Sequence, residues 1–268
     1  MPNNQITSLQ SPHVVRVKAL LGSRGKKTRQ ADKEFIADGI QSVREILRPS
    51  FDDAPKLVNL YVTEKGYAKL LEEISPQVLE EAPIIHVADA VMNEMAETES
   101  PQGILALCKF TEITLYKLKQ RSVKKVAYFW EIQDPGNSGT VIRTAEALGF
   151  DAVVFSNNSV DVYSPKTVRA TVGALSHIPV VEGITLEVLM DFAQSEEFTT
   201  IALAGDGAGS ILDLDKSEKT ILIFGNEARG LPEIAGLHSR VAIPMSGKSE
   251  SLNVASAAAI AMFEVGIR

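Results

Sequence analysis

The stretches ILIFGNEARGLP (residues 221–232) and VAIPMSGKSESLNVASAAAIAMFEV (residues 241–265) decide the fold that this sequence predicts. ILIF and VAIP are short apolar runs typical of buried strands, and they stop at Gly225 and Pro244. A polar loop that contains glycine follows each run. Open α/β sheets bind ligands at the carboxyl ends of their strands, so the two loops predict a binding site. The Ala-rich residues 253–265 predict a closely packed helix.

Apolar runs alternate with amphipathic stretches along the rest of the chain, which predicts an α/β protein. Predicted helices include residues 11–21, 64–74, 89–95, 140–148 and 186–193, and predicted strands include 125–132 and 199–204. A polar, basic stretch without clear periodicity predicts a linker at 111–124. We therefore expect one domain at residues 1–110 and a second at residues 125–268.

The composition excludes several classes of protein. The one cysteine, Cys108, lies in an apolar run, so an intramolecular disulfide is impossible and we expect a reducing, cytoplasmic location. The longest apolar run, residues 254–263, is about half of a membrane span. GDGAGS at 205–210 lacks the dinucleotide-binding spacing, which argues against a nucleotide-dependent oxidoreductase. His and Cys do not cluster, so we expect no metal.

The charge distribution favours an RNA partner despite a net charge of −7. Residues 1–33 hold seven Lys or Arg and one Asp, a local charge of +6, and residues 109–125 hold six Lys or Arg and one Glu, a local charge of +5. Phosphate binding needs such a local positive surface rather than a basic protein. GSRGKKTRQ, at 22–30, predicts a flexible phosphate-binding loop. The candidate RNA-binding residues are Arg16, Arg24, Lys26, Lys27 and Arg29.

Three motifs carry a resemblance to a known family. DPGNSGTVIR contains N-x-G-x-x-x-R at Asn137, Gly139 and Arg143. GNE-x-x-G follows at residues 225–230, and IPM-x-G-x-x-x-SLNV at residues 243–254. Together they resemble motifs one to three of the SpoU/TrmH-type RNA ribose 2′-O-methyltransferases of the SPOUT superfamily. The N-terminal FIADGIQSVRE also resembles that family, with Asp38 in place of its usual Glu. SPKTVRATVGAL resembles another family segment, with Thr171 in place of the frequent Ser.

The resemblance implies a fold, a cofactor and a partner. It implies a C-terminal SPOUT α/β domain with a deep trefoil knot and a small N-terminal α/β RNA-binding domain that resembles a ribosomal protein. It also implies a homodimer packed through the knotted region and S-adenosylmethionine as methyl donor. By resemblance, the residues that bind the donor are Leu203, Ala204, Gly225, Asn226, Ile243, Met245 and Leu252.

The resemblance also implies the catalytic residues. Arg143 would position the ribose–phosphate and stabilise the developing alkoxide, because a guanidinium does not easily give up its proton. The residues that would orient Arg143 or the sugar are Asn137, Glu227, Ser251 and Asn253. We expect methylation of a ribose 2′-hydroxyl in structured RNA, with 23S ribosomal RNA favoured. The alternatives are a transfer-RNA 2′-O-methyltransferase and a catalytically silent RNA-binding or ribosome-assembly factor, and no residue identifies the modified nucleotide.

Overall fold

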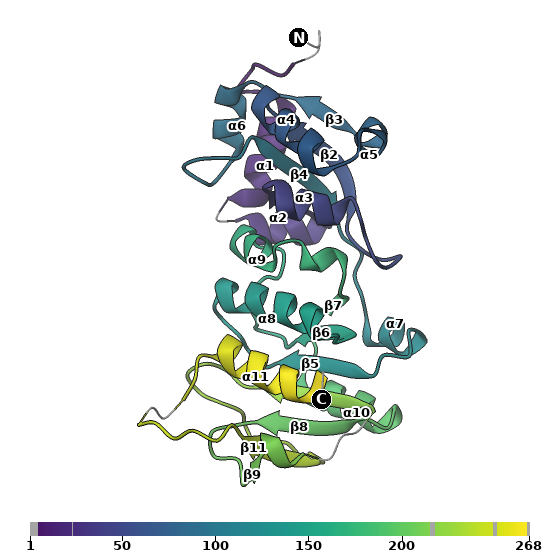
Figure 1. Cartoon of the computed structure of the whole chain (residues 1–268), viewed down its shortest axis with the longest axis vertical. Coiled ribbons are helices and arrows are strands. Elements are labelled where there is room, and N and C mark those ends of the chain that lie inside the picture. Colours follow the sequence, from purple (N-terminus) through teal and green to yellow (C-terminus); the bar gives the residue numbers. More distant parts are fainter. Residues whose placement is uncertain (1–4, 23, 215–217, 249–250, 267–268) are drawn as a thin grey trace. The chain divides into compact units, whose positions relative to one another are not determined.

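The computed structural model describes residues 5–22, 24–214, 218–248 and 251–266 (Figure 1). The chain forms two compact units. Unit 1 comprises Met1–Thr111 and Tyr163–His177, and unit 2 comprises Glu112–Val162 and Ile178–Arg268. No helix within the described ranges is both long enough and apolar enough to cross a membrane.

Unit 1 is built on a four-stranded mixed sheet with the strand order β1-β4-β2-β3. Its strands are β1 (Glu34–Asp38), β2 (Lys56–Val62), β3 (Ile84–His86) and β4 (Ile104–Lys109). β4 pairs antiparallel with both β1 and β2, and β3 pairs parallel with β2. Five of the six residues of β4 are buried, as expected for a strand in the middle of a sheet.

Six helices of unit 1 precede the last strand of its sheet. They are α1 (Pro12–Leu21), α2 (Gly25–Asp32), α3 (Ile40–Ile46), α4 (Glu64–Glu73), α5 (Pro76–Glu81) and α6 (Asp89–Met95). Ser11 caps α1 by accepting a hydrogen bond from the His13 amide, and Pro12 takes the first helical position. Val14, Val17 and Leu20 lie on one face of α1 and join Met92 and Met95 of α6 in the core.

The second segment of unit 1 comes from the middle of the chain. It holds α9 (Pro165–Thr171) and a short 3₁₀ helix (Ala174–Ser176). The Tyr163 ring stacks on Phe110, with centroids 3.8 Å apart. Gly173 has a φ of +92°, and a Cβ there would lie 2.6 Å from the Glu45 Cβ, so this close approach requires glycine. The predicted division at 125–268 therefore differs from the observed units, because residues 163–177 pack within unit 1.

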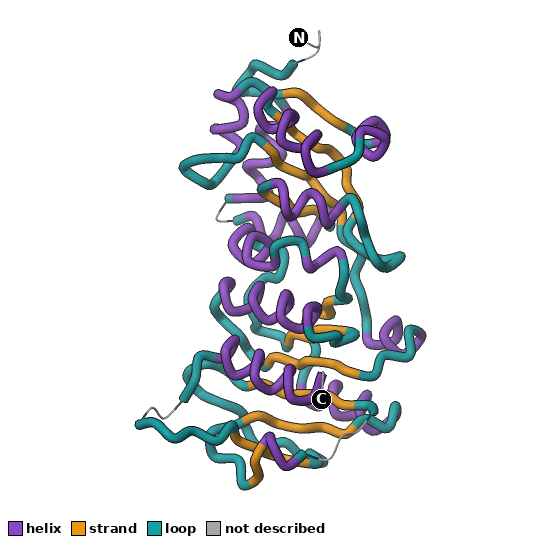
Figure 2. Tube along the Cα trace, in the orientation of Figure 1, coloured by secondary structure: helices purple, strands orange, loops and turns teal. Residues whose placement is uncertain are grey.

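Unit 2 holds a seven-stranded parallel sheet with the order β7-β6-β5-β10-β8-β11-β9 (Figure 2). The strands are β5 (Lys125–Phe129), β6 (Ala152–Phe155), β7 (Val180–Val181), β8 (Thr199–Leu203), β9 (Gly209–Ser210), β10 (Thr220–Phe224) and β11 (Ser239–Ala242). β10 is buried at every residue, and Phe129 and Phe224 stack across β5 and β10 at 4.8 Å. Continuous burial is the pattern of a parallel strand covered on both faces.

The helices of unit 2 include α7 (Leu115–Gln120), α8 (Pro135–Ala147), α10 (Leu186–Ser195) and α11 (Val254–Gly266), with a 3₁₀ turn at Ile211–Asp213. α8 and α11 pack against each other. Gly266 allows this, because a Cβ there would lie 2.6 Å from the Leu148 carbonyl oxygen.

Three local predictions are corrected by the structure. The predicted linker contains α7, which Thr114 caps through the Lys117 amide. α8 begins at Pro135 rather than at Thr140, because Asp134 caps it by accepting from the Asn137 amide. The predicted basic loop at 22–30 instead enters α2 at Gly25, and its Ser23 lies outside the described residues.

Candidate functional site

A pocket lies at the carboxyl ends of three neighbouring strands of unit 2. β8, β10 and β11 run parallel and end at Leu203, Phe224 and Ala242. The cavity has a volume of about 580 Å³, within the usual range for small-molecule sites. It is lined by Leu203, Ala204, Gly205, Phe224, Gly225, Asn226, Glu227, Ala228, Gly230, Ile243, Met245, Ser251, Leu252, Asn253, Val254 and Ala257. The loops after the strands and the start of α11 therefore form one site.

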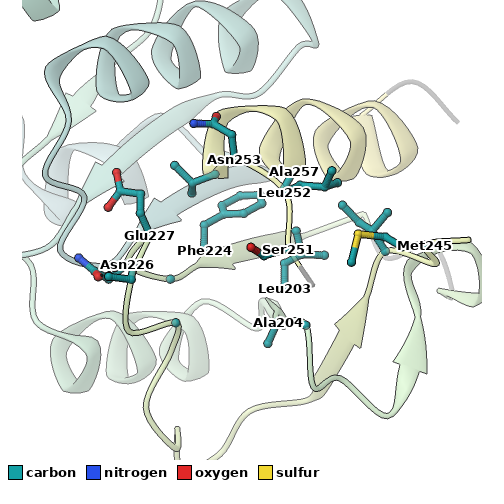
Figure 3. Close-up of a pocket in the computed structure, with 16 residues that line it drawn as sticks. Leu203, Ala204, Phe224, Asn226, Glu227, Met245, Ser251, Leu252, Asn253 and Ala257 are labelled. Atoms are coloured by element: carbon teal, nitrogen blue, oxygen red, sulfur yellow. Dashed lines mark hydrogen bonds between the residues drawn. The ribbon is translucent and has the colours of Figure 1, made fainter. Parts of the chain in front are cut away.

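Every residue predicted to bind the donor lines this pocket, as do three of the five predicted catalytic residues. The predicted donor residues in the lining are Leu203, Ala204, Gly225, Asn226, Ile243, Met245 and Leu252, and the catalytic ones are Glu227, Ser251 and Asn253. Figure 3 shows apolar side chains such as Leu203 and Met245 on one side of the cavity and Glu227 and Asn226 on another. The pocket thus offers both an apolar wall and a polar edge.

The loop 225–230 owes its shape to its two glycines and to Asn226. A Cβ on Gly225 would lie 2.5 Å from the Gly230 carbonyl carbon, and Gly230 has a φ of +64°. The amides and carbonyls of Asn226 and Gly230 pair with each other at 3.0 and 2.9 Å. The buried Asn226 side chain accepts from the amides of Ala228 and Arg229 at 2.9 and 3.0 Å. Asn226 therefore organises the loop's backbone.

A hydrogen-bonded chain joins the three sequence motifs at the edge of the pocket. The Asn137 Nδ2 donates to the Glu227 Oε1 at 3.2 Å, and the Asn253 Nδ2 donates to the Asn137 Oδ1 at 3.1 Å. The Asn253 Oδ1 also accepts from the amides of Ala255 and Ser256 at the start of α11. Asn137 does not itself line the cavity, but it fixes two side chains that do.

Arg143 lies outside the pocket lining. It is exposed on α8, six residues or about 1.7 turns beyond Asn137, and it has no ion pair or hydrogen bond with the described part of the chain. Its five N–H donors are therefore open to an external partner. The structure places Arg143 on the helix that carries Asn137 but does not join it to the chain Asn253–Asn137–Glu227.

The five candidate RNA-binding residues, all in unit 1, fall into two groups. Arg24, Lys26 and Lys27 are exposed. Arg16 forms ion pairs with Asp32, at 2.6 Å, and with Glu34. Arg29 is 5% exposed, and its guanidinium donates to the Leu20 carbonyl at the turn between α1 and α2. Arg29 is therefore buried in α2 and is not exposed in a flexible loop as predicted.

Sequence reasoning missed part of the lining. Phe224, Ala228 and Gly230 lie inside or next to the motif GNE-x-x-G, and their place in that motif was the available signal. Ala257 lies one turn after Asn253 on α11, so helical spacing from the motif could have identified it. Among the described residues, no group of three or more His, Cys, Asp or Glu side chains could hold a metal ion.

Comparison with known proteins identifies relatives of both parts of the chain. Residues 124–263 match the model of the SpoU rRNA Methylase family, and residues 15–106 match the MRM3-like substrate binding domain. The chain is 32% identical over 242 residues to the 23S rRNA (guanosine(2553)-2'-O)-methyltransferase RlmP of Bacillus subtilis, covering 90% of this chain and 91% of that protein.

Two further relatives agree in length and fold. The 23S rRNA (uridine(2479)-2'-O)-methyltransferase of Streptomyces viridochromogenes is 30% identical over 253 residues, covering 92% of this chain and 86% of that protein. The crystal structure of an AdoMet-bound rRNA methyltransferase from Sinorhizobium meliloti matches with a TM-score of 0.83 and 27% identity, covering 98% of this chain and 97% of that one.

Proposed function

Because this chain belongs to the SpoU rRNA methylase family, we propose that it methylates a ribose 2′-hydroxyl of 23S ribosomal RNA with S-adenosylmethionine as donor. The observation that carries the proposal is the chain Asn253–Asn137–Glu227 at the edge of the pocket. It brings three distant motifs together beside a cavity of about 580 Å³. The two 23S rRNA relatives modify different nucleotides, so the proposal stops at the class of RNA.

The pocket lining suits the proposed donor. Leu203, Ile243 and Leu252 provide apolar surface for a purine, and the turn held by Asn226 brings backbone groups of the loop to the cavity. A Cβ on Gly225 would strike the Gly230 backbone and Gly230 has a φ of +64°, so both glycines favour this shape of the loop. When bound, S-adenosylmethionine supplies a methyl carbon that bonds to the ribose oxygen as its carbon–sulfur bond breaks. The residues of the pocket hold, orient and shield the reacting groups.

We assign Arg143 to the RNA substrate. Its exposed guanidinium, which pairs with none of the described residues, can form two parallel hydrogen bonds to a phosphate and can stabilise negative charge that develops on the 2′-oxygen. Glu227 and Ser251 line the pocket and can orient the sugar. Asn137 and Asn253 are positioning residues, because they act on the orientation of the sugar through their hydrogen-bonded chain to Glu227.

We assign RNA binding to unit 1, whose residues 15–106 match a substrate binding domain. Arg24, Lys26 and Lys27 are exposed there and are our candidate phosphate contacts. Arg16 remains a weaker candidate, because Asp32 and Glu34 already balance its charge.

The finer features of the fold are further proposals. We propose that the chain end threads into a trefoil knot and that two copies pair through the knotted region. Ile260 and Phe263, which are 42% and 47% exposed on α11, supply apolar surface for such a dimer. An enzyme that methylates ribosomal RNA acts where ribosomes are assembled, and we propose that this location is the cytoplasm. Sedimentation at micromolar concentration tests the dimer, and a monomer would contradict it.

Arg143→Ala tests the proposed function. We expect wild-type protein to bind S-adenosylmethionine in isothermal titration and to methylate 23S rRNA, with ribose methylation mapped at nucleotide resolution. Arg143→Ala should lose most turnover, about 100-fold or more, while donor affinity stays unchanged, since Arg143 lies outside the pocket. Glu146→Ala, at another exposed residue of α8, is the control. Near wild-type single-turnover methylation by Arg143→Ala would contradict the assignment.

The wild-type protein separates the proposed function from its alternatives. Donor binding by the wild type without methylation of ribosomal RNA would favour a transfer-RNA substrate or a silent RNA-binding factor.

A further inference from the structure

We infer that Glu131 is a positioning residue that holds the loop 225–230 in the shape that binds the donor. The inference rests on the proposed function, since it concerns the same pocket. Glu131 follows β5 by two residues, and its side chain does not line the cavity. It therefore acts on the pocket only through the loop.

The backbone of Glu131 is strained. Its φ of +49° is in the left-handed region, which non-glycine residues adopt at a cost and which persists where the surroundings enforce it. The Glu131 amide donates to the Ser156 Oγ at 2.7 Å, and its carbonyl accepts from the Asn226 Nδ2 at 2.7 Å. Asn226 is the buried residue that organises the loop, and the strained turn at Glu131 places a carbonyl where the Asn226 side chain can donate to it.

The Glu131 carboxylate holds the same loop at a second point. One oxygen pairs with the Arg229 guanidinium, which also lies over the Trp130 ring, 5.5 Å from its centroid. The other oxygen accepts from the Asn158 Nδ2 at 3.3 Å, so the carboxylate is itself held in place. Arg229 stands between Ala228 and Gly230, which both line the pocket. Glu131 thus fastens the loop at Asn226 through its backbone and at Arg229 through its side chain.

This arrangement predicts an effect on donor binding rather than on the chemical step. Gly230 is the loop residue with a positive φ, so the loop has a flexible point beside Arg229. Without the carboxylate, the loop populates other conformations, and apparent affinity falls in proportion to the fraction that remains competent. If one molecule in five keeps the native loop, donor affinity weakens about fivefold.

The test uses Glu131→Gln, which removes the charge, and Glu131→Gly, which removes the carboxylate and relieves the backbone strain. Glycine adopts positive φ without penalty, so Glu131→Gly should unfold at or above the wild-type temperature. We expect both variants to bind S-adenosylmethionine about fivefold more weakly in isothermal titration, with kcat at saturating donor within about twofold of wild type. Glu218→Gln is the control, because Glu218 forms an exposed ion pair with Lys124 at 3.5 Å.

Trp130 provides a second readout, since it is the one tryptophan of the 268 residues. The free variants should show a different emission from the free wild type, because Arg229 leaves the Trp130 ring in them. Arg229→Ala should weaken donor binding as Glu131→Gly does, and the double variant should be no weaker than either. If the wild type binds donor and Glu131→Gly keeps the wild-type donor affinity and Trp130 emission, the role of Glu131 is overturned but the proposed function is not. Failure of the wild type to bind donor would overturn the proposed function with it.

Discussion

Substituting Asn253 by aspartate separates two roles of this side chain. Its Oδ1 caps α11 by accepting from the amides of Ala255 and Ser256 at 2.9 and 3.3 Å. Its Nδ2 donates to the Asn137 Oδ1 at 3.1 Å. Aspartate is as good an N-cap as asparagine and suits the positive end of a helix dipole, but it has no N–H to donate. Asn253→Asp should therefore keep the helix and break the chain to Asn137.

The size of the effect follows from the hydrogen bonds that the amide of Asn137 can still make. The new carboxylate of residue 253 faces the Asn137 Oδ1, and two oxygens cannot form a hydrogen bond. If the Asn137 side-chain amide rotates so that its Nδ2 donates to the carboxylate, that Nδ2 no longer reaches the Glu227 Oε1. One of two bonds is lost in either case. Both are exposed, so the net cost is about 1.4 kcal/mol at most, or about tenfold in rate. We expect kcat/KM to fall about tenfold while the cap of α11 is kept, so that stability falls by no more than the lost hydrogen bond contributes.

Methyl transfer to 23S rRNA and thermal unfolding, measured on the same preparations, test this prediction. Asn253→Ala is the matched control, because it removes both roles. It should lose about 1 kcal/mol of stability as well as activity. An Asn253→Asp protein with wild-type kcat/KM would show that the chain Asn253–Asn137–Glu227 does not position the reacting groups.

Three further predictions concern single residues. Arg29→Ala should lower the free energy of unfolding, measured in urea, by about 1 to 3 kcal/mol, because it leaves the buried Leu20 carbonyl without its donor. Lys26→Ala should leave the free energy of unfolding unchanged and should lower the salt dependence of RNA binding by about one phosphate contact. The reverse pattern would contradict these roles. Gly225→Ala should abolish donor binding in isothermal titration, since its Cβ would lie 2.5 Å from the Gly230 carbonyl carbon; retained affinity would show that the loop can move. Burial raises the pKa of the half-buried Asp38 carboxyl, and attraction to Arg169 only partly offsets this. A pKa that is higher in the folded state gives stability at low pH that is lost as pH rises through it. In chemical denaturation, wild type should therefore lose stability relative to Asp38→Asn as the pH rises above 3.8, the ordinary pKa of the carboxyl. Parallel stability curves would contradict that.

Local sequence patterns predicted most elements because short-range physics determines them. The strands predicted at 221–224 and 125–132 are β10 and β5. The helix predicted at 11–21 is α1, which begins at Pro12 after the cap Ser11. The start of α8 was misplaced because Asp134-Pro135-Gly136-Asn137 suits both a turn and a capped helix start, and only the packed helix distinguishes them.

The sequence by itself determined the α/β class, the positions of the three motifs and a binding site at the two loops, and the donor residues implied by the family resemblance all line the observed pocket. The site could be predicted because parallel strands end at one edge of their sheet, and the loops that follow them must meet there. Only the tertiary structure decided which side chains join. Asn137 meets Glu227 and Asn253 across 90 and 116 residues, and Arg29 turns inward to the Leu20 carbonyl. Such contacts depend on how elements pack, and the type of a polar side chain does not determine its distant partner.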